Sequence, residues 1–225
     1  MPTILITGAN RGIGHALAQS YLQDGWRVFA ASRKPNESLI NGAKAITLDL
    51  SSPESIQELK LTLAGIPIDI VWNNAGVYLD KNQPLEQIDN NDWLRSFEIN
   101  CIAPIRIAEA LVENVSMSER KVIAFTTSKM ASLAVNGARA YAYRSSKAAL
   151  NMAVRCFAKD QEAQGISCLL LHPGHVRTDM GGPEGDIDIA TSITGMRSVV
   201  DQINPACKAN MDEGYFDYDG SRIPW

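Results

Sequence analysis

Short apolar runs alternate with longer helical stretches along this 225-residue chain, and this alternation limits the possible folds most strongly. Strands are predicted at 4–7, 26–32, 43–48, 68–72, 121–126, 166–171 and near Gly214; helices are predicted at 12–23, from 52–53 onward, at 92–113 and at 140–161. Periodicity alone also allows a helical bundle, but the Gly/Pro punctuation and the Val/Ile content favour strands. The sequence therefore predicts an α/β fold, a doubly wound parallel sheet with helices on both faces.

The composition is that of an ordinary globular domain, with 45% hydrophobic and 20% charged residues. The length and the lack of a linker predict a single domain, 1–225. The net charge of −4 disfavours nucleic-acid binding. Because no window approaches a membrane span and the first residues do not resemble a secretory leader, we expect a cytoplasmic protein without membrane contact.

Cysteine and histidine spacing gives no sign of a structural metal or of a disulfide framework. The four cysteines, at 101, 156, 168 and 207, have irregular spacing, so we expect reduced thiols. His172 and His175 flank Pro173-Gly174 and have no further ligand at a suitable spacing. We expect no metal, and we expect His175 to be a loop residue.

A glycine-rich turn follows the first predicted strand directly and opens a helix. It reads Thr7-Gly8-Ala9-Asn10-Arg11-Gly12-Ile13-Gly14. A helix N-terminus with free backbone N–H groups attracts a pyrophosphate. Gly8 suits the tight turn, Gly12 allows the ligand to approach the backbone, and Gly14 allows the helix to pack closely on the strand. The spacing G-x-x-x-G-x-G differs from G-x-G-x-x-G, and a purely structural turn is the alternative.

Tyr143 and Lys147 lie four residues apart on a predicted helix, and therefore on one face of it. A cation about 4 Å from the phenol is worth about 4 kcal/mol at an effective dielectric of 20. This interaction could lower the pKa of Tyr143 by up to about three units, toward the range useful for a general acid or base. An exposed i,i+4 pair is the alternative interpretation.

Four motifs in order make the chain resemble the short-chain dehydrogenase/reductase superfamily. They are the glycine turn, Asn73-Asn74-Ala75-Gly76 after the fourth strand, Tyr143-x-x-x-Lys147, and Pro173-Gly174 with Thr178. The segment 143–151 and the C-terminal Tyr218-Asp219-Gly220 and Ile223-Pro224-Trp225 resemble the C-factor-like and Sniffer-like carbonyl reductase branch. The resemblance implies a Rossmann-like sheet that binds a nicotinamide cofactor.

The resemblance also implies roles for catalytic residues. Tyr143 would exchange a proton with the substrate oxygen, Lys147 would hold the nicotinamide ribose, and Asn100 would support a water relay to Lys147. Ser128 would bind the substrate oxygen, although it lies two residues farther from Tyr143 than is usual and Met130 takes the usual position. Thr127 and Ser132 are the alternatives to Ser128. A cap or a buried hydrogen bond is the alternative role for Asn100.

The cofactor is expected to be NADP. NAD-dependent relatives carry an acidic residue at the end of the second strand, whereas this chain has Ser32 followed by Arg33, and Arg11 lies in the glycine turn. Guanidinium groups bind a 2′-phosphate that a carboxylate would repel. The expected cofactor-binding residues are Gly8, Asn10, Arg11, Gly12, Ile13, Gly14, Ser32, Arg33, Asp49, Leu50, Asn74, Ala75, Gly76, Tyr143, Lys147, Pro173, Gly174, Val176 and Thr178. For Asp49, a helix cap is the alternative role.

The expected function is hydride transfer between NADP(H) and a small carbonyl or alcohol substrate. An NADP-binding signalling or redox-sensing module is the alternative, and epimerisation or dehydration on the same scaffold is a third hypothesis. We expect residues 179–203 to form a small mobile substrate lid with hinges at Gly181, Gly182 and Gly185. The family resemblance implies a homodimer or homotetramer.

Overall fold

The computed structural model describes residues 1–35, 40–203 and 214–225. Its strands are β1 (Thr3–Thr7), β2 (Arg27–Ser32), β3 (Lys44–Thr47), β4 (Ile70–Asn73), β5 (Val122–Thr126), β6 (Ser167–His172) and β7 (Tyr215–Asp217). Its α-helices are α1 (Gly12–Gln23), α2 (Pro53–Thr62), α3 (Asn90–Phe97), α4 (Ala103–Ala110), α5 (Val112–Ser116), α6 (Tyr141–Asp160) and α7 (Ile189–Gln202). Cys207 lies outside the described residues, in which Cys101, Cys156 and Cys168 are free thiols.

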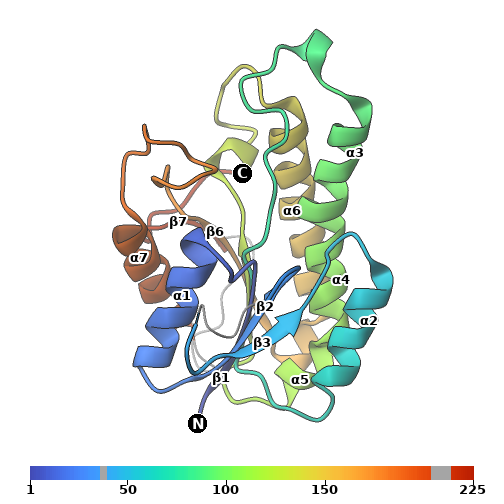
Figure 1. Ribbon diagram of the computed structural model, residues 1–225, viewed down its shortest axis with the longest axis vertical. Coiled ribbons are helices and arrows are strands. Elements are labelled where there is room, and N and C mark those ends of the chain that lie inside the picture. Colours follow the sequence, from blue (N-terminus) through green and yellow to red (C-terminus); the bar gives the residue numbers. More distant parts are fainter. Residues whose placement is uncertain (36–39, 204–213) are drawn as a thin grey trace.

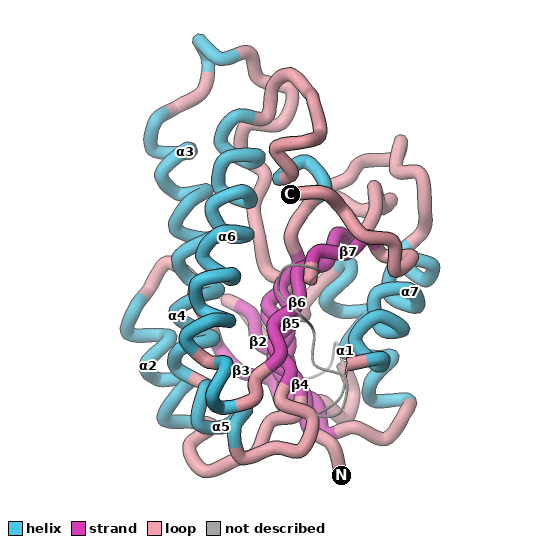
Figure 2. The backbone as a smooth tube through the Cα atoms, turned by 180° about the vertical axis from the view of Figure 1, so that it is seen from behind, coloured by secondary structure: helices cyan, strands magenta, loops and turns pink. Residues whose placement is uncertain are grey.

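The strands described form one parallel sheet in the order β3-β2-β1-β4-β5-β6-β7. The order reverses direction between β1 and β4, which places a ligand crevice at the carboxyl ends of these strands. Helices α1 and α7 lie together on one face, and α2, α4 and α6 lie on the other (Figures 1 and 2). The prediction of a doubly wound α/β sheet is confirmed.

Alternation along the strands explains how the sheet separates two apolar layers. In β1, Ile4 and Ile6 pack toward Leu17 and Val199 on the α1/α7 side, whereas Leu5 packs into the layer under α2, α4 and α6. Because every side chain of β1 is buried, neither face of the strand is exposed to solvent.

Most predicted element boundaries are correct to within two residues, and α2 begins as expected. The Ser52 hydroxyl accepts a hydrogen bond from the Ser55 amide, and Pro53 occupies the first turn. The stretch 92–113 is helical almost throughout, as expected, but it is not one regular α-helix. The chain forms α3, a π-helical turn at Glu98–Ile102, α4 and then α5, and the Ala103 amide donates to the carbonyl oxygen of Glu98.

The expected lid at 179–203 is a loop followed by helix α7. The helix packs against α1, with Met196, Val199 and Val200 buried. Two of the expected hinge glycines have a packing role. A Cβ built at Gly181 would lie 2.0 Å from the Val176 carbonyl oxygen, and a Cβ built at Gly185 would lie 2.4 Å from the Arg177 amide nitrogen. Mobility of the preceding loop remains a prediction.

Candidate active site

The glycine turn packs against the end of β4 at the crevice. Gly8 has a φ of +68°, and a Cβ there would lie 2.9 Å from the Ala75 Cα atom. At Gly14 a Cβ would lie 2.3 Å from the Gly8 carbonyl oxygen and 2.5 Å from Asn74 Nδ2. Gly8 therefore has the turn conformation predicted for it, and Gly14 allows the close packing predicted between the helix and the strand.

Thr7 joins the ends of β1 and β4 and was not singled out by the sequence analysis. Its hydroxyl accepts hydrogen bonds from the amides of Asn74 and Ala75, both at 3.1 Å, and Asn74 Nδ2 donates to its carbonyl oxygen. The Asn74-Ala75-Gly76 segment is thereby held beside the glycine turn.

The residues expected to bind the adenosine part of the cofactor and to set the preference for NADP over NAD lie at the ends of β2 and β3. Ser32 is buried, whereas Arg33 is exposed. Asp49 Oδ1 accepts hydrogen bonds from the amide and hydroxyl of Ser51, which lower the pKa of the Asp49 carboxyl, and Arg33 contributes to the lowering. Since Ser52 caps α2, the alternative of Asp49 as its cap is wrong.

Arg11 does not lie free in the glycine turn. Its guanidinium pairs with Asp179 at 2.7 Å, and both side chains are largely exposed. Lys81, from the loop after β4, donates to the carbonyl oxygen of Met180 at 2.7 Å. The loop that follows Thr178 is therefore bonded to both sides of the crevice.

The segment after β6 is held by backbone pairing and by α7. Gly174 has a φ of +83°, and the Pro173 carbonyl oxygen accepts a hydrogen bond from Ser192 of α7. Val176 is buried and pairs with Ile187, while the Thr178 hydroxyl accepts from the Gly181 amide. His175 lies on this exposed loop, as expected.

Tyr143 lies in the first turn of α6, and the nearby side chain of Ser128 lowers the pKa of its phenol. Thr127 and Ser132, the alternatives to Ser128, have other partners: Thr127 donates to Asn151 Oδ1, and Ser132 donates to the carbonyl oxygen of Pro224. Ser128 is thus the hydroxyl that the fold brings to Tyr143.

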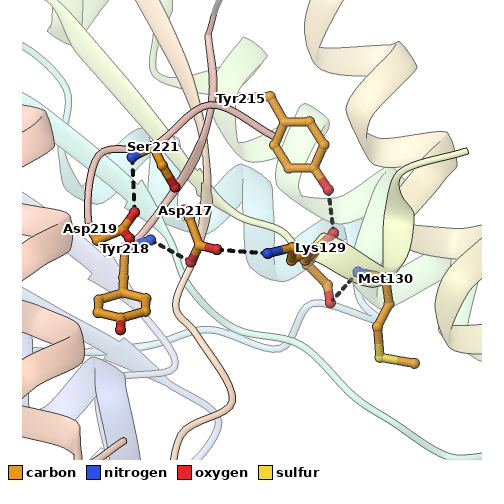
Figure 3. Close-up of polar contacts among 8 residues, drawn as sticks. Lys129, Met130, Tyr215, Asp217, Tyr218, Asp219 and Ser221 are labelled. Carbon is orange, nitrogen blue, oxygen red and sulfur yellow. Dashed lines mark hydrogen bonds and ion pairs between the residues drawn. The ribbon is translucent and has the colours of Figure 1, made fainter. Parts of the chain in front are cut away.

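The loop that carries Ser128 is held by β7 (Figure 3). The Tyr215 phenol donates to the carbonyl oxygen of Ser128, and the Lys129 ammonium pairs with Asp217 at 3.4 Å. The Ser128 hydroxyl also accepts from the Met130 amide at 3.2 Å. These contacts fix the backbone on both sides of the Ser128 side chain.

Lys147 is buried one turn after Tyr143, and its Nζ donates to the Thr126 carbonyl oxygen at 2.8 Å. The expected lowering of the Tyr143 pKa is wrong for this structure. Burial raises the pKa of Tyr143 to about 12, and the side chain of Ser128 offsets only part of this rise. Burial also lowers the pKa of Lys147 to about 8.

Asn100 lies in the π-helical turn and is fully buried. Its Oδ1 accepts from the Val77 amide at 2.8 Å, and its Nδ2 donates to the Val77 carbonyl oxygen and to the Ser146 hydroxyl. A Cβ at Gly76 would lie 3.1 Å from Asn100 Oδ1 and 3.4 Å from Lys147 Nζ. Asn100 and Lys147 therefore both border Gly76.

Two further residues that the sequence analysis missed contact the start of α6. The Tyr78 ring stacks on the Tyr143 ring with centroids 4.4 Å apart, and the buried Asp80 carboxylate accepts from the amides of Ala142 and Tyr143. Both residues closely follow Gly76, but nothing in the sequence indicates partners more than 60 residues away.

The described residues contain no group of three or more His, Cys, Asp and Glu side chains suited to a metal. The helices in the described ranges include none that is long and apolar enough to cross a bilayer.

A family model for short chain dehydrogenases matches residues 2–187, so the chain belongs to that family. The C-signal protein of Myxococcus xanthus is 42% identical over 160 residues, which cover 71% of this chain and 93% of that protein. The resemblance to the C-factor-like and Sniffer-like branch is confirmed by this relative and by the solved structures that follow.

Two carbonyl reductase structures superimpose on the whole chain. That of Pseudomonas aeruginosa PAO1, in complex with NADP, is 35% identical with a TM-score of 0.86, and each chain is covered completely. The carbonyl reductase Sniffer of D. melanogaster is 26% identical with a TM-score of 0.87, again with complete coverage of both chains. The chain is therefore a Rossmann-like oxidoreductase of the short-chain family, with NADP-binding structural relatives.

Proposed function

We propose that the protein is an NADPH-dependent carbonyl reductase that reduces a small carbonyl compound to an alcohol. The observation that carries the proposal is the grouping of Ser128, Tyr143 and Lys147 at the carboxyl edge of the sheet, beside the glycine turn. NADPH would supply the hydride, and the chain would position the substrate and its proton.

The proton would come from Tyr143. With a pKa raised to about 12, the phenol stays protonated at neutral pH, which suits a general acid that donates to the developing alkoxide. Ser128 would hold the carbonyl oxygen beside that phenol by a second hydrogen bond. A protonated donor favours reduction over alcohol oxidation at neutral pH.

Lys147 and Asn100 would support Tyr143. Because its pKa is about 8, Lys147 keeps most of its charge near pH 7, where it would stabilise the phenolate left after proton transfer and hold the nicotinamide ribose. Asn100 fixes Val77 and Ser146 around Lys147, and we propose that it borders a water relay to that lysine.

The residues of the crevice suit a dinucleotide. The glycine turn leaves no room for a Cβ at Gly8 or Gly14, and the remaining positions of the expected cofactor set line the same edge of the sheet. Arg33 is exposed beside Ser32 and would bind the 2′-phosphate, while Arg11 would have to leave Asp179 to contribute. NADP in the Pseudomonas relative supports this choice.

The proposal also includes a single domain with a loop at 179–188 that closes over a small carbonyl or alcohol, a homodimer or homotetramer, and a cytoplasmic location. A signalling or sensing role remains a second candidate, favoured by the relative named C-signal. That role would require NADPH binding without turnover.

The test is to follow NADPH and NADH oxidation at 340 nm with a panel of ketones, diketones, quinones and aldehydes. We expect turnover with NADPH, and Arg33→Ala should weaken NADPH binding about tenfold or more while NADH binding stays nearly unchanged. A preference for NADH would contradict the cofactor assignment. Tight NADPH binding without oxidation of either cofactor by any compound of the panel would favour the signalling role.

A further inference from the structure

Asp80 is a fully buried acidic residue without an assigned role in the reaction. Its Oδ2 accepts from the Ala142 amide at 2.8 Å, and its Oδ1 accepts from the Tyr143 amide at 3.2 Å. Among the described residues, no cation forms a salt bridge with Asp80, so the helix N–H groups are the donors that offset its burial.

The start of α6 lacks a cap from its own sequence. Ala140 occupies the N-cap position and has no side chain that could accept a hydrogen bond. It also has a left-handed backbone with a φ of +54°, as does Arg139 before it with a φ of +65°. Two successive non-glycine residues in this conformation cost energy and persist only where other contacts hold them.

Asp80 supplies the missing cap from a distance of 62 residues along the chain. The amides of Ala142 and Tyr143 are the second and third of the helix, which a local N-cap side chain would normally bond. The Asp80 side chain therefore makes the hydrogen bonds of an N-cap at the turn that carries Tyr143.

The same short segment also contacts the other groups of the site. The backbone amide and the carbonyl oxygen of Val77 each form a hydrogen bond with the Asn100 side chain. The Tyr78 ring stacks on the Tyr143 ring. Residues 77–80 thus connect Asn100 to both the ring and the backbone of Tyr143.

We propose that Asp80 is a positioning residue that fixes the first turn of α6 and so places the Tyr143 phenol against Ser128. This inference rests on the proposed function for its catalytic consequence, but the capping itself does not. Asp80 touches no reacting atom; it acts through the amide of Tyr143.

The experiment compares wild type, Asp80→Ala, Asp80→Asn and the control Asp89→Ala. Asp89 caps the neighbouring helix α3 through the Asn91 amide and lies outside the site. Hydrogen exchange of the peptide that covers residues 140–147 is measured first, because it does not depend on activity. Turnover with the best carbonyl substrate and the dissociation constant of NADPH follow.

We expect Asp80→Ala to speed amide exchange at the start of α6 by about tenfold or more. It should lower kcat by about tenfold to hundredfold, while the NADPH dissociation constant changes by less than about twofold. Asp80→Asn keeps one acceptor oxygen but turns an amino group toward the second amide. It should therefore show intermediate effects, with about threefold faster exchange and a kcat lowered by about threefold to tenfold. Asp89→Ala should leave exchange in 140–147 and turnover unchanged.

Unchanged exchange in both Asp80 variants would overturn the proposal. Faster exchange with wild-type turnover would also overturn it, because α6 would then be loosened without moving the proton donor. If Asp80→Ala does not fold, Asp80→Asn alone decides through the same two measurements. If wild type reduces no carbonyl, the proposed function fails, whereas the exchange comparison still decides whether Asp80 fixes this turn.

Discussion

A buried lysine and a half-buried tyrosine lie one turn apart on α6, and the loss of solvent around them moves their pKa values in opposite directions. The pKa of Lys147 falls to about 8 and that of Tyr143 rises to about 12. Both shifts favour the neutral form of the group. The lysine therefore loses its proton in the folded protein at a lower pH than in the unfolded chain.

This difference predicts how stability depends on pH. Between about pH 8 and pH 10 the unfolded chain keeps a proton on Lys147 that the folded protein has released, so the contribution of Lys147 to the free energy of unfolding should rise with pH. In Lys147→Met this pH-dependent gain in the free energy of unfolding should be absent; it approaches about 2 to 3 kcal/mol over the interval. Urea unfolding of both proteins at several pH values measures it, and parallel curves would contradict the assigned burial effect.

Tyr78 supports the Tyr143 ring by stacking, which predicts different effects for two substitutions. Tyr78→Phe keeps the stacked ring and should retain turnover within about twofold. Tyr78→Ala should lower kcat by about twofold to tenfold, since an aromatic pair is worth about 0.5 to 1.5 kcal/mol. Steady-state kinetics with NADPH checks this, and equal losses in both variants would show that the hydroxyl, rather than the stacked ring, matters.

At the scale of elements, the contact between α1 and β4 depends on the absence of a side chain at Gly14. Gly14→Ala would place a Cβ against the Gly8 carbonyl oxygen and Asn74. We expect a loss of about 1 to 3 kcal/mol in stability and weaker NADPH binding, because backbone must move to make room. Urea unfolding and fluorescence titration measure the two effects.

The matched control for that substitution is Gln19→Ala, at an exposed position of the same helix. It should leave both stability and NADPH binding nearly unchanged. If Gly14→Ala behaves like the control, the close approach between α1 and β4 does not limit the fold.

Element boundaries could be predicted where the local sequence determines them. Ser52-Pro53 starts α2 as expected, and the Val/Ile-rich runs become strands. The π-helical turn that joins α3 to α4 could not be predicted, because it depends on what Asn100 bonds across the molecule. Helical periodicity continues through residues 92–113 and does not reveal this turn.

At the scale of the whole molecule, the parallel order of the sheet brings the predicted groups to one edge. Tyr143 could be predicted from its motif, and Ser128 could be predicted from its place after a strand although its spacing to Tyr143 is unusual; the fold brings the two side chains near each other. The rise in the pKa of Tyr143 could not be predicted, because it depends on burial that the whole fold creates. The contacts of Tyr78 and Asp80 likewise join segments that are distant in the chain.

The most direct test of the account is NADPH oxidation by Tyr143→Phe beside the matched control Tyr141→Phe. Tyr141 lies two residues earlier on α6 and is exposed. The account predicts that Tyr143→Phe binds NADPH like wild type but loses at least about a hundredfold in kcat, whereas Tyr141→Phe keeps its turnover. Carbonyl reduction at the wild-type rate by Tyr143→Phe would contradict the assignment of Tyr143 as the proton donor.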